Sequence, residues 1–160
     1  MATERKTVTL FIYLPDEKQV ILSRRGKLEK HAGLLQATVH GQIEPGEISQ
    51  IAMKREFEEE IKGNYNLLTN IQDYGEAVVG DTTAEHTFYH AASLEAAHVQ
   101  ELQPTQEVEE LVMVGENDLA KIVPYSKIKG QEGYDFKANM VMFDDEIEVL
   151  KKIFKDYSKL

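Results

Sequence analysis

The sequence predicts an α/β fold in which a mixed β-sheet lies between helices. Segments rich in β-branched and aromatic residues alternate irregularly with segments of helical pattern, which is typical of a mixed sheet covered by helices. The 160 residues are 42% hydrophobic and 29% charged, which is ordinary for a folded domain of this size. No internal repeat or Pro/Gly/Ser-rich linker interrupts the chain, and we therefore expect residues 1–160 to form one domain.

The N-terminal part contains three expected strands. Residues 7–14 are rich in β-branched and aromatic side chains, and residues 19–23 follow closely enough to pair with them as a hairpin. Residues 34–40 have the same character and end at Gly41. A loop with Pro and Gly comes next, so we expect the third strand to lead directly into it.

The rest of the chain supplies helices and further strands. Residues 47–62 contain strong helix formers without Gly or Pro, and Gly63 is a natural stop. Apolar residues at helical spacing predict a closing helix over residues 144–157, with acidic residues at its positive end. The remaining expected elements are strands at 71–79, 86–92 and 110–114 and a short helix at 117–122.

The composition limits the classes of function. Lys and Arg number 18 against 28 Asp and Glu, which gives a net charge of −10. A chain this acidic repels a phosphate backbone, so we do not expect a nucleic-acid partner. A small anionic substrate is compatible with the charge if bound cations reverse the local field. The absence of cysteine excludes disulfides, thiolate zinc sites and a Cys nucleophile.

No stretch of the chain resembles a targeting or membrane segment. Residues 1–6 are mostly polar and lack the apolar region of a signal peptide. No apolar run is long enough to span a bilayer. We therefore expect a cytoplasmic protein without a membrane partner.

The acidic helix is the most informative feature of the sequence. Glu56, Glu59 and Glu60 stand at helical spacings i, i+3 and i+4, which brings three carboxylates to one face. Like charges at these spacings destabilise a helix. A solvated acidic face is the ordinary explanation, but Ala52 and Phe57 border this one. A binding site for a hard divalent cation explains the pattern better, since such ions prefer carboxylate oxygens.

These residues stand in a recognisable motif. The segment resembles the Nudix signature, in which Gly is followed after five residues by Glu, and after seven more by Arg-Glu, an apolar residue, any residue and Glu-Glu. The matching positions are Gly41, Glu47, Arg55, Glu56, Phe57, Glu59 and Glu60. The signature's last glycine falls on Lys62, and Gly63 follows it. We expect the helix to run one residue longer before Gly63 caps it.

The resemblance implies a fold and an activity. The fold is a Nudix-type α/β/α sandwich with a mixed β-sheet between helices. The activity is that of a pyrophosphohydrolase that uses Mg²⁺, or Mn²⁺ in its place, to cleave a diphosphate linkage in a nucleotide or nucleoside-diphosphate derivative. Such an ion neutralises phosphate charge, orients the substrate and activates water. A small-molecule diphosphate is the expected partner, and the sequence is compatible with a homodimer without requiring one.

The resemblance also assigns roles to motif residues. It makes Glu56 and Glu60 the primary metal ligands, with Glu59 as a third ligand or as the base that activates water. Glu47 is expected to pair with Arg55 and hold the loop against the helix, in a supporting role.

Further expected contacts lie around the motif. The backbone carbonyl of His40, just before Gly41, is expected to face a metal ion. Arg24 and Arg25 follow a strand and precede the motif, where relatives place a phosphate-contacting arginine, and Arg suits bidentate phosphate contacts. Glu101 and Glu107 lie in the part of the chain from which relatives recruit an extra acidic residue. No spacing fixes either one, so neither belongs to the core set.

Several functions stay open on the sequence alone. Residues 23–25 and 38–41 resemble the isopentenyl-diphosphate-isomerase-like branch of the same fold, whose isomerases use a catalytic cysteine that this chain lacks. A non-catalytic ligand-binding or regulatory domain is a second alternative, but such domains often lose the motif carboxylates that are intact here. RNA decapping fits the charge poorly. The identity of the diphosphate substrate does not follow from the sequence.

Overall fold

The computed structural model describes residues 5–79 and 84–160. Residues 1–4, which belong to the segment read for a signal peptide, and residues 80–83 lie outside the described part. No helix in the described ranges is long and apolar enough to cross a membrane. In chain order the elements are β1 (Arg5–Leu14), β2 (Gln19–Arg25), β3 (Leu35–Ala37), β4 (Val39–Gln42), α1 (Ser49–Glu60), η1 (Tyr65–Leu67), β5 (Thr69–Val79), β6 (Glu85–Ser93), η2 (Ala96–Glu101), β7 (Val108–Gly115), η3 (Glu116–Lys121), β8 (Val123–Pro124), α2 (Tyr125–Ile128), β9 (Val141–Met142) and α3 (Asp144–Tyr157).

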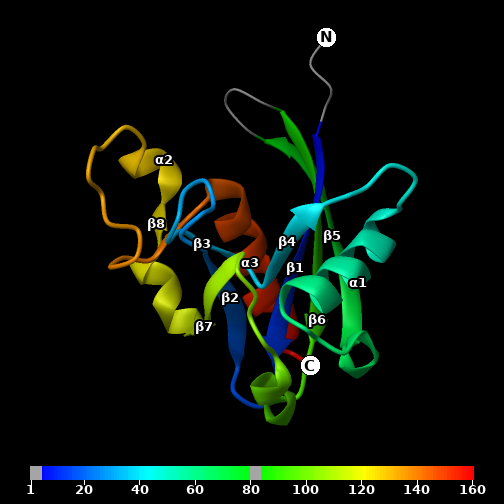
Figure 1. Ribbon diagram of the computed structural model, residues 1–160. Coiled ribbons are helices and arrows are strands. Elements are labelled where there is room, and N and C mark those ends of the chain that lie inside the picture. Colours follow the sequence, from blue (N-terminus) through cyan, green and yellow to red (C-terminus); the bar gives the residue numbers. More distant parts are fainter. Residues whose placement is uncertain (1–4, 80–83) are drawn as a thin grey trace.

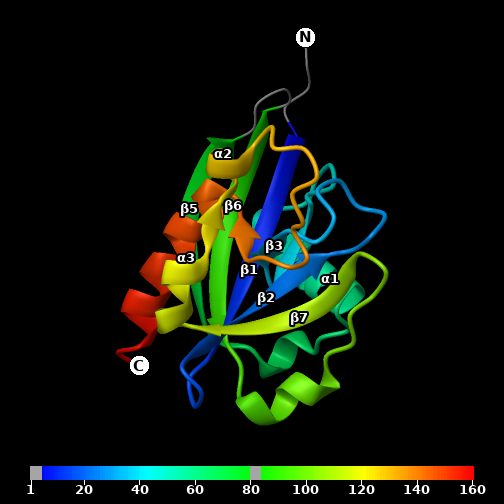
Figure 2. The same cartoon turned by 90° about the vertical axis from the view of Figure 1, so that its left-hand side faces the viewer.

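The strands form a mixed sheet with helices on both faces, as predicted. β1 pairs parallel with β6 and antiparallel with β2 and β4. On the outer sides, β5 pairs antiparallel with β6, and β7 pairs antiparallel with β2. Figure 2 shows α3 on one side of these strands and α1 on the other, and Figure 1 shows the same layers from the front. Two separate apolar clusters fill the two interfaces, one around Phe11 and Leu150 on the α3 side and one around Leu10 and Phe57 on the α1 side.

The alternation of β1 explains how one strand serves both clusters. Val8, Leu10 and Ile12 contribute to the α1-side cluster, whereas Phe11 and Tyr13 contribute to the α3-side cluster. Successive side chains of a strand point to opposite faces, and a strand covered on both faces reads as a continuous apolar run. This is why the segment looked uniformly hydrophobic in the sequence.

The sheet divides at Thr38. The prediction of a single strand over residues 34–40 is therefore wrong. β3 pairs with β2 and β4 pairs with β1, so the chain passes from one neighbour to the other at this residue. The Thr38 hydroxyl accepts a hydrogen bond from the Ile12 amide at 2.8 Å and donates to the carbonyl of Ile21. It therefore satisfies backbone groups where β1 and β2 separate, and two short strands result.

The other differences concern boundaries and short elements. The expected strand at 71–79 begins two residues earlier, as β5 (Thr69–Val79), and the helix expected at 117–122 is the 3₁₀-helix η3 (Glu116–Lys121). The closing helix α3 has the expected bounds, Asp144–Tyr157. Sequence patterns did not reveal η1, η2, β8, α2 and β9, each of which has at most six residues and too few positions to show a period.

The end of α1 corrects the expectation of a longer helix. The helix ends at Glu60, and Lys62 takes a left-handed conformation with φ of 56°. This is the conformation that a glycine adopts without strain, and it stands at the position where the Nudix signature has glycine. Gly63 has another reason to be glycine, because a Cβ there would lie 2.1 Å from the Phe57 ring. Lys62 therefore keeps the turn geometry of the motif in spite of its side chain.

We predict that Lys62→Gly stabilises the protein by about 0.5–1 kcal/mol, because it removes the strain of a left-handed non-glycine residue. Equilibrium unfolding in urea measures the change. Lys62→Ala is the matched control: it removes the same charge but keeps the strain, so its stability should stay near that of the wild type. Equal gains in both variants would attribute the effect to charge and contradict the backbone explanation.

Candidate active site

Three carboxylates from two segments come together beside α1. One oxygen from each of Glu56, Glu60 and Glu107 lies within 4.8 Å of the other two. Glu56 is partly buried, Glu60 is buried and Glu107 is exposed, so the group reaches from the interior to the surface. Glu59, the third acidic residue of the helix motif, is not part of this group. Its side chain is 64% exposed.

Glu60 is the residue with the most unfavourable surroundings. It is 3% exposed, and neither carboxylate oxygen has a hydrogen-bond partner of normal geometry among the described residues. Burial, followed by the charges of Glu56 and Glu107, raises the pKa of Glu60 to about 9. The backbone amide of His40 and the charge of Arg25 oppose this shift. An ionised carboxylate is costly here unless a cation neutralises it.

Gly41 makes the approach of Glu56 to the sheet possible. A Cβ at Gly41 would lie 2.2 Å from Cδ of Glu56 and 2.6 Å from its Oε2. The motif glycine is therefore required for close packing of a carboxylate against β4, not for a positive φ angle. Burial raises the pKa of Glu56, and its hydrogen bond from Arg55 opposes that shift.

Arg55 joins the loop before α1 to the acidic face. Its guanidinium donates to both oxygens of Glu47 at 2.8 and 2.9 Å, to the carbonyl of Gln42 at 2.9 Å and to Glu56 Oε1 at 2.8 Å. A longer bond of 3.3 Å reaches Glu59. The bonds from Arg55, together with the amide of Glu44, lower the pKa of Glu47 to about 2. The pairing expected between Glu47 and Arg55 is present in this geometry, and it orients Glu56.

Glu107 is brought to the site by backbone hydrogen bonds at the end of α1. The carbonyl of Glu60 accepts from the amide of Thr105 at 3.1 Å and from its hydroxyl at 2.9 Å. The carbonyl of Ile61 accepts from the amide of Gln103 at 2.8 Å. These contacts hold the segment before β7 along the helix end. No spacing in the sequence predicts them, which is why Glu107 could be considered but not assigned.

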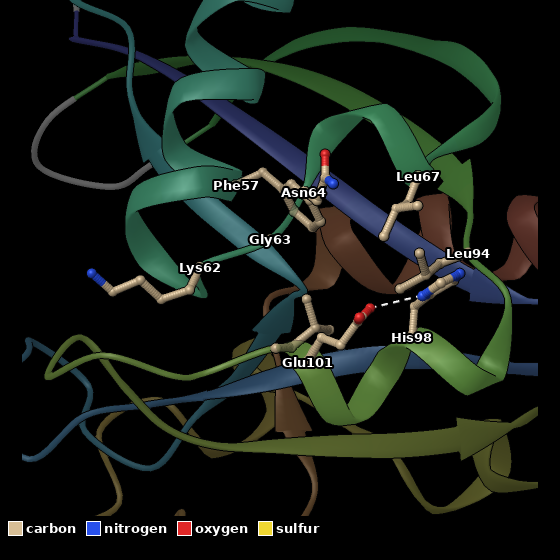
Figure 3. A pocket seen from close by; sticks show the side chains of 9 residues that line it. Phe57, Lys62, Gly63, Asn64, Leu67, Leu94, His98 and Glu101 are labelled. Carbon is tan, nitrogen blue, oxygen red and sulfur yellow. Dashed lines mark hydrogen bonds and ion pairs between the residues drawn. The ribbon is translucent and has the colours of Figure 1, made fainter.

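Glu101, the other acidic residue considered outside the motif, lies elsewhere. Its carboxylate pairs with His98 Nδ1 at 2.7 Å, and Figure 3 shows this pair among the side chains that line one cavity. It lines a cavity of about 160 Å³ enclosed by η1, η2 and the end of α1. Glu56, Glu60 and Glu107 do not line this cavity. Glu101 is therefore a surface ion-pair residue in this structure.

The two arginines expected to contact phosphate have different surroundings. Arg24 is buried, and its guanidinium donates to Glu110 Oε1 at 2.8 Å and to the carbonyls of Gly33 and Phe136 at 2.8 and 3.1 Å. These bonds fasten two loops together and leave Arg24 with a structural role. Arg25 donates to the carbonyl of Lys30 and to Gln36. Its charge opposes the rise in the pKa of Glu60, so Arg25 lies near the carboxylate group.

His40 lies between the carboxylate group and the opposite face of the sheet. Its backbone amide faces Glu60, as described above. Burial and the nearby Arg25 and Arg5 lower the pKa of its imidazole to about 4, so the ring is neutral at pH 7. The role expected of the His40 carbonyl as a metal contact stays a prediction.

A second buried carboxyl lies on the other face of the sheet. Glu146 of α3 is 3% exposed, and its Oε1 accepts a hydrogen bond from the Ala37 amide at 2.6 Å. Burial, followed by the charge of Asp145, raises the pKa of Glu146 to about 8. Asp145 itself accepts a hydrogen bond from the Tyr89 hydroxyl at 2.5 Å. Glu146 is therefore mostly protonated at pH 7.

Comparison with known proteins gives a family and a set of similar folds. The sequence profile of the NUDIX domain matches residues 3–133. No curated protein matches the chain. The NUDIX domain of Shewanella oneidensis NrtR, in complex with ADP ribose, superimposes with a TM-score of 0.68 at 14% identity, covering 97% of this chain and 89% of that one.

Two further solved structures are similar over nearly their whole lengths. A NUDIX hydrolase from Alicyclobacillus acidocaldarius has a TM-score of 0.67 at 15% identity, covering 98% of this chain and 94% of that one. A C. elegans Ap4A hydrolase, solved as a binary complex, has a TM-score of 0.65 at 17% identity and covers 98% and 99%. At these identities the structures establish a common fold.

We predict that the stability of the protein falls as pH rises through neutrality, and that Glu146→Gln reduces this slope. The pKa of Glu146 is about 8 in the folded state and lies near its ordinary value when unfolded. Between those values the folded state binds a proton that the unfolded state lacks, so unfolding becomes easier as pH rises. The variant should flatten the slope by at most about 1.4 kcal/mol per pH unit.

Urea unfolding in metal-free buffer from pH 5 to pH 8 measures this slope. Glu148→Gln is the control, because Glu148 is exposed on the same helix and pairs only loosely, at 3.4 Å, with Lys151. The two variants having the same slope would contradict the assignment of a neutral Glu146.

Proposed function

The chain belongs to the NUDIX domain family, and on that premise we propose that it is a Mg²⁺-dependent pyrophosphohydrolase that cleaves a diphosphate linkage in a nucleotide or nucleoside-diphosphate derivative. Family membership agrees with the enzyme class that the motif indicated, a Nudix hydrolase. The observation that carries the proposal is the buried Glu60 carboxylate, which lies beside two further carboxylates and for whose oxygens residues 5–79 and 84–160 provide no hydrogen-bond partner of normal geometry.

The residues of this group fit a hard divalent cation. Glu56, Glu60 and Glu107 offer only carboxylate oxygens, which Mg²⁺ and Mn²⁺ prefer, and the chain has no cysteine that would favour a softer metal. A cation would supply the missing partner of Glu60 and remove the repulsion among the three charges. The exposed position of Glu107 leaves one side of the group open to substrate and water. We propose these three residues as the ligands.

The bound ion supplies charge neutralisation on the phosphates and a lowered pKa of attacking water. The protein's own residues do the rest. Arg55 holds Glu56 in place through its 2.8 Å bond and ties the Gln42 carbonyl to the helix. Arg25 faces the group with a positive charge and is the residue that we propose to contact a substrate phosphate.

The reaction itself is a hydrolysis. The water oxygen forms a bond to one phosphorus, the bridging P–O bond breaks, and the second phosphate-containing half leaves. The water's proton passes to a carboxylate. Because Glu107 completes the group of three, Glu59 is available to act as this base. Its side chain is exposed and lies about one helical turn from Glu56, which suits that role.

The substrate class is proposed on chemistry shared with similar structures. The NrtR domain is complexed with ADP ribose, and the C. elegans enzyme is an Ap4A hydrolase. Both compounds contain adenosine attached to linked phosphates. The net charge of −10 disfavours a polymer substrate and has little effect on a small one held by cations. The intact carboxylates disfavour a purely ligand-sensing role.

We predict that Glu60→Gln abolishes Mg²⁺-dependent cleavage, lowering kcat/KM by at least about 100-fold, while the fold is kept. The amide cannot bind the cation as a charged ligand but has nearly the same shape. A phosphate-release screen against nucleoside triphosphates, nucleotide sugars, dinucleotides and dinucleoside polyphosphates measures turnover, with circular dichroism as the check on folding. Wild-type turnover in the folded variant would remove Glu60 from the metal site.

We also predict that Glu107→Gln weakens Mg²⁺ binding by roughly 10-fold, because one of three anionic ligands is lost. Titration calorimetry with MgCl₂ measures the affinity. Glu101→Gln is the matched control, since Glu101 is also an exposed acidic residue before β7 but pairs with His98. Equal affinities of the two variants would show that Glu107 is a surface residue with no part in the site.

A further inference from the structure

The segment that carries Glu107 is a tight turn. The amide of Val108 donates to the carbonyl of Thr105 at 3.0 Å, which closes a turn of the β type. Gln106 and Glu107 occupy its central positions, and both residues are exposed. The place that the Glu107 carboxylate takes therefore depends on the groups that hold this turn.

Both ends of the turn are fastened to regular elements. At the first end, the amide and the hydroxyl of Thr105 donate to the carbonyl of Glu60, at 3.1 and 2.9 Å. At the other end, Val108 begins β7 and pairs with Arg25 of β2, and Figure 2 shows these two strands side by side. The turn is thus fixed to α1 on one side and to the sheet on the other.

Gly26, the residue after β2, holds the middle of the turn. Its amide donates to the carbonyl of Glu107 at 3.0 Å. This bond continues the contact between β2 and β7 by one residue beyond the pair of Arg25 and Val108. The backbone of Glu107 is therefore bonded to the end of β2, although its side chain is exposed.

The contact at Gly26 leaves no room for a side chain. A Cβ there would lie 2.4 Å from the carbonyl oxygen of Gln106 and 3.3 Å from the carbonyl carbon and oxygen of Glu107. All of these are backbone atoms, and they can withdraw only if the turn itself moves. Gly26 does not have a positive φ angle. The position therefore requires glycine for close packing and not for conformational freedom.

We propose that Gly26, together with Thr105, is a positioning residue for metal binding: the two hold the turn where the Glu107 carboxylate reaches Glu56 and Glu60. The inference rests on the proposed function, because it explains how the third ligand of that site is held. One oxygen of each carboxylate lies within 4.8 Å of the other two. Mg²⁺ requires near-ideal ligand geometry, so a displaced turn would weaken its binding.

The alternative explanation is that Gly26 only lets two loops pack. A packing defect, or a shift of the neighbouring Arg25, would act on Mg²⁺ binding whether or not residue 107 is a carboxylate. A positioning role acts only through the Glu107 carboxylate. Glu107→Gln removes that charge with little change of shape. The effect of Gly26→Ala in the Glu107→Gln background therefore separates the two explanations.

Titration calorimetry with MgCl₂ compares wild type, Gly26→Ala, Glu107→Gln and the double variant. We expect Gly26→Ala to weaken Mg²⁺ binding by roughly 10-fold, which is usual for residues that hold a metal ligand in place. The double variant should bind no more weakly than Glu107→Gln alone. Two independent losses of this size would instead multiply to roughly 100-fold.

Thr105→Val tests the other anchor and does not depend on the folding of Gly26→Ala. It removes the hydroxyl bond to the Glu60 carbonyl and keeps the amide bond. Mg²⁺ binding should weaken by roughly 3-fold, the effect of one lost hydrogen bond. This loss should also disappear in the Glu107→Gln background.

Gly115→Ala is the matched control. Gly115 lies at the other end of β7 and also lacks a positive φ angle. In the described part of the chain, a Cβ there would meet only Asp118 Oδ2, at 3.8 Å. This variant should bind Mg²⁺ as wild type does. Circular dichroism checks that each variant is folded.

Two results would overturn the positioning role. One is a folded Gly26→Ala protein that binds Mg²⁺ as tightly as wild type, and the other is a loss that is equally large in the Glu107→Gln background. If Gly26→Ala does not fold, Thr105→Val decides in the same way. Wild-type affinity in Glu107→Gln would contradict the proposed ligand set and the positioning role together. Weaker binding in Glu107→Gln beside either of the first two results would leave the proposed function standing.

Discussion

The burial of the Glu60 carboxylate is the constraint on which the rest of the site depends. A carboxylate that is 3% exposed and finds no hydrogen-bond partner of normal geometry in the described part of the chain must either keep its proton or bind a cation. Because Glu56 and Glu107 add negative charge beside it, Glu60 keeps its proton in the metal-free protein. A bound cation, when present, is the more favourable way to neutralise this group. Gly41 and Arg55 serve the same constraint, because one lets Glu56 approach β4 and the other fixes its direction.

The main strands and helices of the fold follow from hydrophobic patterns, and these patterns are visible in the sequence. The uniform hydrophobicity of β1 reflects cores on both faces, and the amphipathic pattern of α3 gave its bounds. The division of the sheet at Thr38 was not readable, because a hydroxyl that bonds the separating strands looks like any other threonine inside a β-branched run. Local patterns report which face is buried, but they do not report which neighbour a strand pairs with.

For the candidate site too, local patterns in the sequence predicted the residues on one helix but not the residues that long-range contacts bring to it. Helical spacing brings Glu56 and Glu60 to one face without any knowledge of the fold. Glu107 depends on backbone bonds from Thr105 and Gln103 to the end of α1, and such long-range bonds leave no periodic signal. Arg24 and Arg25 are adjacent in sequence, yet one fastens loops and the other faces the carboxylates. Their roles differ because their side chains contact different groups in the folded protein, and the sequence does not show those contacts.

Stability and function can be separated within this structure by asking which polar groups lack partners. Lys62 has a strained backbone at a helix end, whereas Glu60 has two buried carboxylate oxygens for which the described residues provide no hydrogen-bond partner of normal geometry. A glycine at position 62 would relieve the strain there, so this strain does not indicate a ligand. The Glu60 carboxyl, by contrast, either keeps its proton or is neutralised by a cation that enters the protein.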